Sequence, residues 1–289
     1  MPVDKQPLDA SRCSADRPGS LPFHPVDLCQ PDTMKSCAAC CGLYNWQDHS
    51  RTAITGIVSM QTDLFSALDS YDNLDEYRLR RDQRINNTKL FETIYNCEFV
   101  GFVDRERRRV GCLLHPSVTG IPALRNHCFY GAKICHEHFC PGYGCLTTPE
   151  QLAVVSAVQD WYLFGLVITD IDLVKEFFRH VENALGESIK PARLSQPELR
   201  HILHDFFSLK EHWQFKAAEN RLGKYYFSAS EYAIARIDYC ARWGVPESRF
   251  DKILVSLESE FSSYEQVLSA EEMLQEKIHA FIRAYSAAH

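Results

Sequence analysis

Apolar residues recur at helical spacing between Ile54 and Tyr95, in a stretch that includes Ile57, Leu64 and Leu68. Side chains three or four positions apart lie on one face of an α-helix, so this spacing indicates a buried helical face. We predict two helices here, between the first group of cysteines and those that follow residue 96.

Helical spacing returns after Cys145 and continues to the end of the chain. The run Thr148-Pro-Glu-Gln151 offers a capping threonine, a proline at the first helical position and a glutamine at the third. It predicts a helix that extends to about Phe164. A similar capping box begins at Ser228, and Gly186 and Gly244 are typical helix ends.

The pattern between these helical regions favours β-structure. Residues 98–103 and 109–114 are short apolar runs on either side of a charged tip, which predicts a β-hairpin. If the tip is Asp104-Arg105, Cys97 lies opposite Cys112, with Cβ atoms about 4.5–5.5 Å apart. Two thiols would then face one site, although another tip length would change the register.

Together these patterns predict a mainly α protein in three parts. Residues 1–30 contain five prolines among polar residues, which favours a flexible lead-in without secondary structure. Residues 31–147 form an irregular, cysteine-rich metal-binding domain with a small β-hairpin. Residues 148–289 form an all-helical domain.

Composition excludes several classes of function. The 289 residues are 45% hydrophobic and 24% charged, as in globular proteins, and contain no apolar run that could cross a bilayer. A net charge of −7 disfavours nucleic acid and anionic membranes as partners. The first twenty residues lack the apolar stretch of a secretory signal, so we expect a cytoplasmic location.

Cysteine provides the strongest chemical signal. Eleven of the twelve cysteines lie between Cys13 and Cys145. A reducing compartment keeps such thiols reduced, so metal ligation explains them better than disulfides or buried free thiols. Cys240, which has no companion, is interpreted as a core residue. Cys13 and Cys29 are left unassigned.

The clustered cysteines fall into three groups. The first group is Cys37-Ala-Ala-Cys40-Cys41, whose C-x2-C spacing can direct two sulfurs toward one metal centre. The second group is the hairpin pair, Cys97 and Cys112. The third group ends in Cys140-Pro. The predicted metal ligands are Cys37, Cys40, Cys41, Cys97, Cys112, Cys128, Cys135 and Cys140. Four nearby histidines are interpreted as non-ligands, with His115 the best candidate among them: His115, His127, His136 and His138.

The ligand pattern favours an iron–sulfur cluster such as 4Fe-4S over zinc. Zinc takes four ligands, commonly in two tight pairs, whereas these cysteines are dispersed and exceed four. Eight thiolates also suffice for two zinc ions, so Zn2+ remains the alternative.

These residues resemble a bacterial family of zinc- or iron-chelating domains named for the motif C-x3-C-x2-C-C. The resemblance covers residues 33–145 and rests on Cys37, Cys40 and Cys41 with Gly42, on Cys97 and the run Gly111-Cys112-Leu-Leu-His115-Pro116, and on Cys135 and Cys140-Pro141. The first cysteine of the motif would fall at Thr33. This chain therefore either lacks that ligand or uses Cys29 in its place.

The family includes flagellin lysine N-methylase, so the resemblance implies that a protein-modifying enzyme with a protein substrate is an alternative. The chain has no glycine-rich nucleotide loop of the kind that identifies a methyl-donor site. The leading hypothesis is a metal-binding protein with a redox or cluster-dependent role and a protein partner. A third hypothesis is a zinc-stapled interaction module without redox activity.

Overall fold

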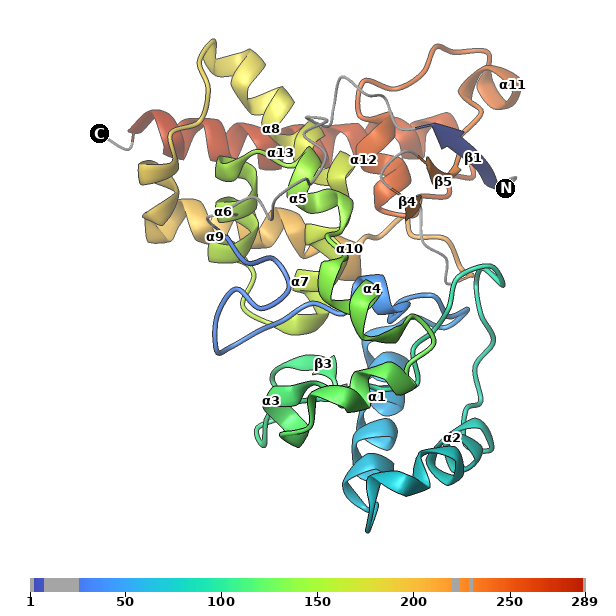
Figure 1. The fold of residues 1–289 in the computed structure, drawn as a ribbon. Coiled ribbons are helices and arrows are strands. Elements are labelled where there is room, and N and C mark those ends of the chain that lie inside the picture. The colour runs from blue at the N-terminus through green and yellow to red at the C-terminus, as the bar shows by residue number, and fades with distance from the viewer. Residues whose placement is uncertain (1–2, 8–25, 220–223, 229–230, 288–289) are drawn as a thin grey trace.

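The computed structural model describes residues 3–7, 26–219, 224–228 and 231–287 (Figure 1). The protein is mainly α, as the sequence predicts, and its two groups of helices meet around α7. The elements of the N-terminal region are α1 (Arg51–Ser66), α2 (Leu74–Asp82), β2 (Val100–Phe102), β3 (Val110–Cys112), α3 (Pro116–Thr119) and α4 (Gly131–Glu137), with 3-10 turns at Ala39–Cys41 (η2), Tyr71–Asn73 (η3) and Pro122–His127 (η4).

The C-terminal region consists mostly of helices. They are α5 (Pro141–Cys145), α6 (Thr148–Ala157), α7 (Trp161–Ile168), α8 (Ile171–Leu185), α9 (Pro197–Phe207), α10 (Leu209–His212), α11 (Tyr239–Trp243), α12 (Asp251–Ser256) and α13 (Tyr264–Ala287), with a 3-10 turn at Pro191–Ser195 (η5). None of the helices within the described ranges is long and apolar enough to span a membrane.

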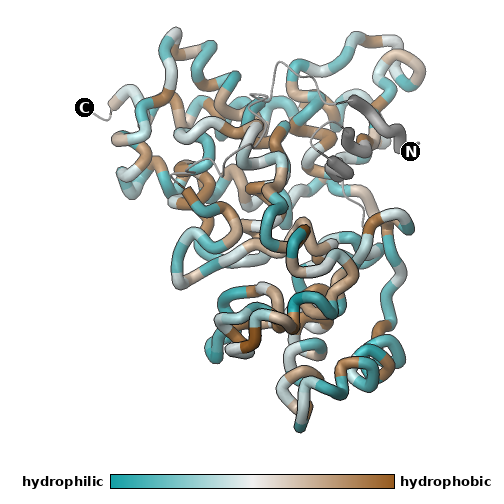
Figure 2. Tube along the Cα trace, in the orientation of Figure 1, coloured by the Kyte–Doolittle hydropathy of each residue, from teal (hydrophilic) through white to brown (hydrophobic). Residues whose placement is uncertain are grey.

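The two predicted helices of the N-terminal region are present as α1 and α2. The Ser50 side chain accepts a hydrogen bond from the backbone N–H of Ala53 and caps α1. One face of α1 is buried, and the backbone N–H of Phe102 in β2 donates to the Thr62 hydroxyl on that helix. Most of α2 is hydrophilic (Figure 2), and Tyr77 is the fully buried residue that attaches it.

The hairpin is present, but its predicted register was wrong. Cys112 pairs with Val100 rather than with Cys97. The backbone N–H of Val103 donates to the carbonyl oxygen of Arg109, so the tip is longer than two residues. The Asp104 carboxylate accepts the backbone N–H groups of Arg108 and Arg109 and stabilises this longer tip.

Helix boundaries in the C-terminal region differ slightly from the prediction. The capping residue of α6 is Thr147, in a capping box with Glu150, and not Thr148. The helix ends at Ala157 rather than at Phe164, because Asp160 caps a second helix, α7. Gly186 and Gly244 both end helices in the left-handed conformation, as predicted.

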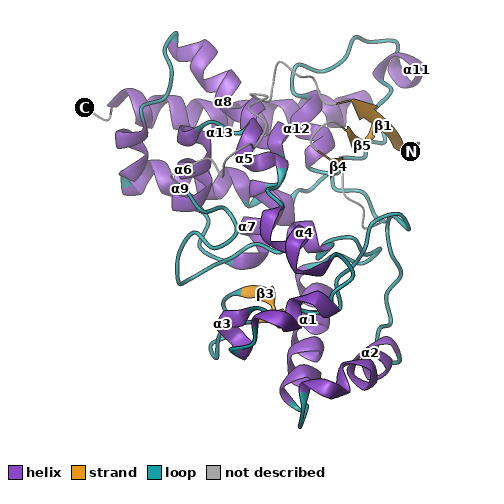
Figure 3. Cartoon of the chain, viewed as in Figure 1, coloured by secondary structure: helices purple, strands orange, loops and turns teal. Residues whose placement is uncertain are grey.

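A small antiparallel sheet, in the order β1-β5-β4, corrects the prediction that the C-terminal region is all-helical (Figure 3). Its strands are β1 (Val3–Pro7), β4 (Lys224–Ser228) and β5 (Glu231–Ala235). The capping box at Ser228 does not begin a helix, since aromatic and branched residues here pair as strands. Val3–Pro7 likewise forms a strand where the sequence predicts none, while residues 8–25 lie outside the described residues.

Aromatic packing forms the core of the C-terminal region. The ring of Phe177 on α8 lies 4.4 Å from that of Phe206 on α9 and 5.3 Å from that of Phe281 on α13, measured between centroids. All three side chains are fully buried. Burying each contributes about 2–3 kcal/mol, so these three helices form a firm support for the segments that pack on them.

The two regions meet where the loop after the first cysteines packs on α7. The Tyr44 hydroxyl donates a 2.9 Å hydrogen bond to the carbonyl oxygen of Tyr162, and the Tyr162 hydroxyl donates one of 2.6 Å to the carbonyl oxygen of His49. Tyr44 lies against Gly165, where a Cβ atom would come within 2.2 Å of its hydroxyl oxygen. Only glycine permits this close approach of the two regions.

Candidate metal centre

The first cysteine motif lies on a loop that ends in the 3-10 turn η2. The buried Ser36 hydroxyl donates a 2.7 Å hydrogen bond to the carbonyl oxygen of Val110 and ties the loop to β3. Gly42 follows with φ 76°, and a Cβ atom there would meet the carbonyl oxygen of Tyr95 at 2.2 Å. Consecutive residues on a 3-10 turn point about 120° apart, so Cys40 and Cys41 face different surroundings.

Cys29 lies beside Cys37. The backbone N–H of Cys37 donates a 2.8 Å hydrogen bond to the carbonyl oxygen of Cys29. The Tyr143 hydroxyl oxygen accepts the backbone N–H of Cys29 and lies 3.7 Å from its sulfur. Cys29 is exposed as a residue, yet burial of its thiol, followed by the proximity of Cys140, raises its pKa to about 11.

Cys140 completes this arrangement from α5. The Cys40 thiol donates a hydrogen bond to the Cys140 sulfur, which raises the pKa of Cys40 and lowers that of Cys140. Burial raises the pKa of Cys37 well above its usual value, and the nearby Cys140 and Cys29 add to this effect. We call Cys29, Cys37, Cys40 and Cys140 the first thiol group.

Cys41 lies near a second set of thiols, and its charge also interacts with those of Cys37 and Cys40 in the first group. Burial, followed by the proximity of Cys112 and Cys135, raises the pKa of Cys41 to about 12. Cys97 is placed next to Cys41 by a 2.9 Å hydrogen bond from its backbone N–H to the Cys41 carbonyl oxygen. Burial and then the proximity of Cys41 raise the pKa of Cys97 well above its usual value.

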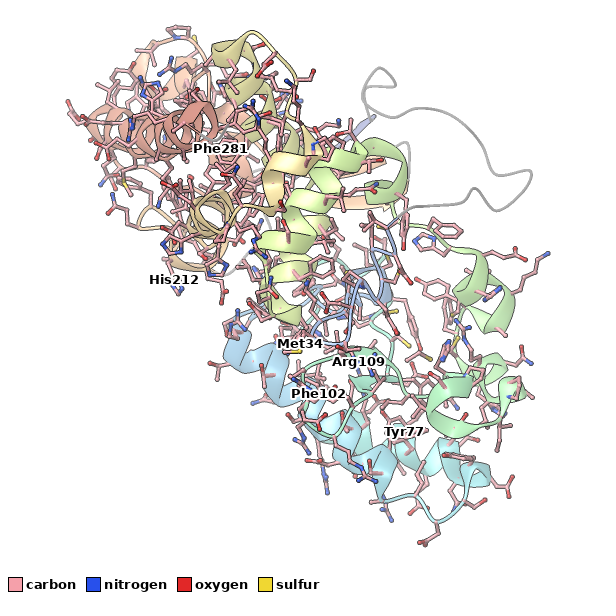
Figure 4. The ribbon with its side chains drawn as sticks, turned by 90° about the vertical axis from the view of Figure 1, so that its left-hand side faces the viewer. Met34, Tyr77, Phe102, Arg109, His212 and Phe281 are labelled. Carbon is pink, nitrogen blue, oxygen red and sulfur yellow. The ribbon has the colours of Figure 1, made fainter. Side chains whose placement is uncertain are left out.

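Cys128, which precedes α4 by three residues, and Cys135, which lies on α4, complete the second set. Their sulfur atoms are 3.2 Å apart. Burial raises the pKa of Cys112, and the charge of Cys128 adds to this, whereas that of Arg125 opposes it. We call Cys41, Cys112, Cys128 and Cys135 the second thiol group. Figure 4, in which Met34, Arg109 and Tyr77 are labelled, shows yellow sulfur atoms in this part of the molecule.

A cation accompanies the second thiol group. The Arg125 guanidinium donates a 2.8 Å hydrogen bond from Nη2 to the carbonyl oxygen of Cys135. Its Nε atom is buried and has no hydrogen-bond partner within the described ranges. A buried guanidinium nitrogen without a partner is costly, and negative charge on the neighbouring thiols would offset that cost.

All eight predicted ligands lie in this region, divided between two groups, with Cys97 beside the second. Cys29, which the sequence left unassigned and offered only as a replacement for the motif cysteine at Thr33, lies with the first group. Arg125, Tyr143 and the division itself depend on tertiary contacts and have no local signal. The interpretation of Cys240 as a core residue was wrong, because Cys240 is exposed on the short helix α11.

The histidines have no evident part in either group. His115 caps α3: its Nδ1 accepts the backbone N–H of Ser117 and lies 2.6 Å from the Ser117 hydroxyl. Burial lowers the pKa of His115, and the charge of Arg125 adds to this effect. The other three histidines are exposed residues: His127, His136 and His138.

The donor chemistry suits a thiophilic metal, but the spacing is that of metal-free thiols. In the described part of the chain, no three His, Cys, Asp or Glu side chains are gathered closely enough to hold a metal ion as they stand. Tetrahedral zinc with Zn–S bonds of about 2.3 Å separates its sulfurs by about 3.8 Å. The sulfurs of Cys128 and Cys135, at 3.2 Å, would part slightly to admit a metal.

Comparison with known proteins adds no family. No family model matches the chain, and neither the curated proteins nor the solved structures contain a significant match. The resemblance to the C-x3-C-x2-C-C family therefore rests on the cysteine motifs alone.

Proposed function

We propose that this protein binds a thiolate-ligated metal centre, an iron–sulfur cluster, and uses it in a redox or cluster-dependent role. The observation that carries the proposal is the gathering of free thiols from distant segments: residues 29–41 meet Cys140 in one group, and Cys41 meets residues 112–135 in the other. Buried, uncharged thiols gain little from such gathering, whereas thiolates on a soft metal each contribute a bond.

Zinc is the second candidate. The observation that favours it is that each group offers four thiols, the number that a structural zinc ion takes. Its role would be to hold weakly ordered segments together, since the loop of residues 26–38 contains no helix or strand and residues 120–140 contain only two short helices, η4 and α4. In that case the protein is an interaction module without redox activity.

Protein-lysine methylation, the activity of one family member, has no support of this kind. Such an enzyme needs a cleft beside the metal for a protein substrate and a methyl donor. Two pockets, of about 620 and 900 Å³, are lined by residues of the C-terminal region, and neither lining includes a cysteine of the two thiol groups. The proposal therefore does not extend to methyl transfer.

The test is metal and acid-labile sulfide content, with a visible spectrum, on full-length protein purified without oxygen. Iron and sulfide in near-equal amounts with broad visible absorption are expected. Zinc without sulfide would replace the cluster by a structural ion. Protein that folds and contains neither metal would overturn the proposal.

A further inference from the structure

Two thiols on either side of a tight turn lie in direct contact. The sulfur atoms of Cys128 and Cys135 are 3.2 Å apart, and both cysteines are free. A disulfide bond holds its sulfurs about 2.0 Å apart, so a movement of about 1 Å brings this pair to bonding distance. Among the described residues, no three His, Cys, Asp or Glu side chains are close enough to hold a metal ion. Two touching thiols without a third donor are the starting arrangement for a disulfide.

Local contacts hold these two sulfurs opposite each other. Gly131, with φ 71°, reverses the chain before α4, and its backbone N–H donates a 3.0 Å hydrogen bond to the carbonyl oxygen of Cys128. The Arg125 guanidinium donates its 2.8 Å hydrogen bond to the carbonyl oxygen of Cys135. The contacts that position the pair therefore lie within residues 125–135 and include no metal.

The two thiols differ in exposure. Cys128 is 6% exposed and is buried in the cluster that contains Tyr77, whereas Cys135 is half-buried and packs only partly against that cluster. The residues next to them in the sequence, Phe129 and Ile134, are 72% and 55% exposed. A reagent in solution therefore reaches Cys135 before Cys128. Redox-sensing pairs share this arrangement, in which an accessible cysteine meets the oxidant and a neighbouring cysteine resolves the product.

We propose that Cys128 and Cys135 form a redox-active dithiol, which a small-molecule disulfide such as oxidised glutathione converts to an intramolecular disulfide. The Cys135 sulfur attacks one sulfur of oxidised glutathione, so that a mixed disulfide forms, the glutathione S–S bond breaks, and one glutathione leaves with the proton of Cys135. Cys128 then attacks the Cys135 sulfur and releases the second glutathione, which takes the proton of Cys128. The protein loses two electrons and two protons, and one oxidised glutathione becomes two reduced molecules.

The dithiol would also link oxidation to the proposed metal binding. Cys128 and Cys135 are both predicted ligands, so the closed disulfide would withdraw two thiolates from a metal. That consequence rests on the proposed function. Formation of the disulfide depends only on the contact between the two thiols.

Disulfide mapping by mass spectrometry tests the proposal on the full chain, purified without oxygen. The reaction is run on the protein as purified and after treatment with a chelator. Burial, followed by the hydrogen bond to Cys128, raises the pKa of Cys135 to about 12, so exchange is slow and oxidised glutathione is supplied in excess. The remaining thiols are blocked before digestion. Wild type treated with chelator is expected to yield the peptide that joins Cys128 to Cys135, in preference to other pairings.

Three variants assign the roles of the two thiols. Cys128→Ser should stop the reaction at the glutathione adduct of Cys135, because no neighbouring thiol remains to resolve it. Cys135→Ser should leave Cys128 unmodified in the folded chain, because Cys128 is buried. Cys240→Ser, which changes an exposed cysteine on α11, is the matched control and should form the Cys128–Cys135 disulfide as wild type does.

The same reaction in denaturant, where a mixture of disulfides is expected, controls for pairing in an unfolded chain. Chelator-treated wild type that keeps its circular dichroism spectrum and leaves the two thiols free, or pairs either with another cysteine, would overturn the proposal. If the chelator unfolds the chain, the reaction of the protein as purified decides in the same way. A selective disulfide in a chain that is purified without metal would overturn the proposed metal binding alone, and a metal-containing chain that forms no such disulfide would overturn the dithiol alone.

Discussion

The backbone N–H of Cys37 donates a 2.8 Å hydrogen bond to the carbonyl oxygen of Cys29, so two cysteines eight positions apart lie side by side. Thr33, which stands where the family motif has its first cysteine, is exposed in the loop between them. The loop thus brings the upstream thiol of Cys29 beside the first cysteine motif, whereas the side chain of Thr33 is exposed. This relationship favours Cys29 as the replacement ligand.

Replacing Cys29 should therefore remove metal, whereas replacing Thr33 should not. We expect Cys29→Ser to lower metal content, because the binding free energy that this thiolate contributes is lost with the ligand. Thr33→Ser is the matched control in the same loop and should leave the content unchanged. Equal metal loss in both variants, measured by elemental analysis, would exclude Cys29 as a ligand.

The metal-free protein should become less stable as pH rises above about 9, the ordinary thiol pKa. Burial raises the pKa of Cys41 and of Cys135 to about 12, and that of Cys29 to about 11. A raised pKa means that the fold favours the protonated thiol. The resulting stability is fully present below pH 9 and is lost as pH rises toward 12.

Chemical denaturation of chelator-treated protein at pH 8 and pH 10.5 measures this effect. Alkylation gives a second readout, because only the thiolate reacts. At pH 8 the exposed Cys240 should be modified faster than Cys41 in the metal-free protein. Equal alkylation rates at these two positions, or a stability independent of pH, would show that the thiols are not buried as described.

A buried ion pair stabilises the C-terminal region independently of metal. The Lys210 ammonium donates hydrogen bonds of 2.9 Å to the Asp170 carboxylate and 2.7 Å to the carbonyl oxygen of Ser256. Lys210 and Asp170 are 5% and 6% exposed, so removal of the lysine leaves a carboxylate charge in the interior. We expect Lys210→Met to lower the free energy of unfolding by about 3–5 kcal/mol.

The control for this ion pair is an exposed one. Arg80 and Glu76 pair at the surface of α2, where both side chains are about half exposed. Arg80→Ala should cost less than about 1 kcal/mol, because water screens the pair. Thermal unfolding of the two variants should differ clearly, and a similar small loss in both would mean that Lys210 is hydrated in solution.

Local patterns accounted for the elements but not for their pairing. The two helices α1 and α2 and the helix ends at Gly186 and Gly244 depend on nearby residues and were predicted correctly. The register of the hairpin depends on the length of its tip, which Asp104 sets through hydrogen bonds that periodicity does not reveal. Cys112 consequently pairs with Val100.

Contacts between segments that are distant in sequence also limited what could be predicted of the candidate site. The motif spacing selected eight cysteines as candidate ligands, and the structure brings them into one region. It could not divide them, because Cys40 and Cys41 are neighbours in sequence and differ only in the direction that η2 gives their side chains. Strand β1 was missed for a related reason, as its partner β5 lies near the other end of the chain.

Gly165 should control the junction between the two regions. A Cβ atom there would lie 2.2 Å from the Tyr44 hydroxyl oxygen, and Tyr44 is buried and hydrogen-bonded to the carbonyl oxygen of Tyr162. The ring cannot move aside without losing that bond. We expect Gly165→Ala to destabilise the protein by about 1–3 kcal/mol, as overpacking does in other cores.

Two further variants make this prediction specific. Gly56, exposed on α1 with open space around its Cα, is the control: Gly56→Ala should stabilise the helix by up to about 1 kcal/mol.

Adding Tyr44→Phe to Gly165→Ala removes the oxygen nearest to the new methyl group, so the double variant should recover part of the loss. A double-mutant cycle in denaturant measures the coupling, and strict additivity of the two changes would show that Tyr44 does not rest on Gly165.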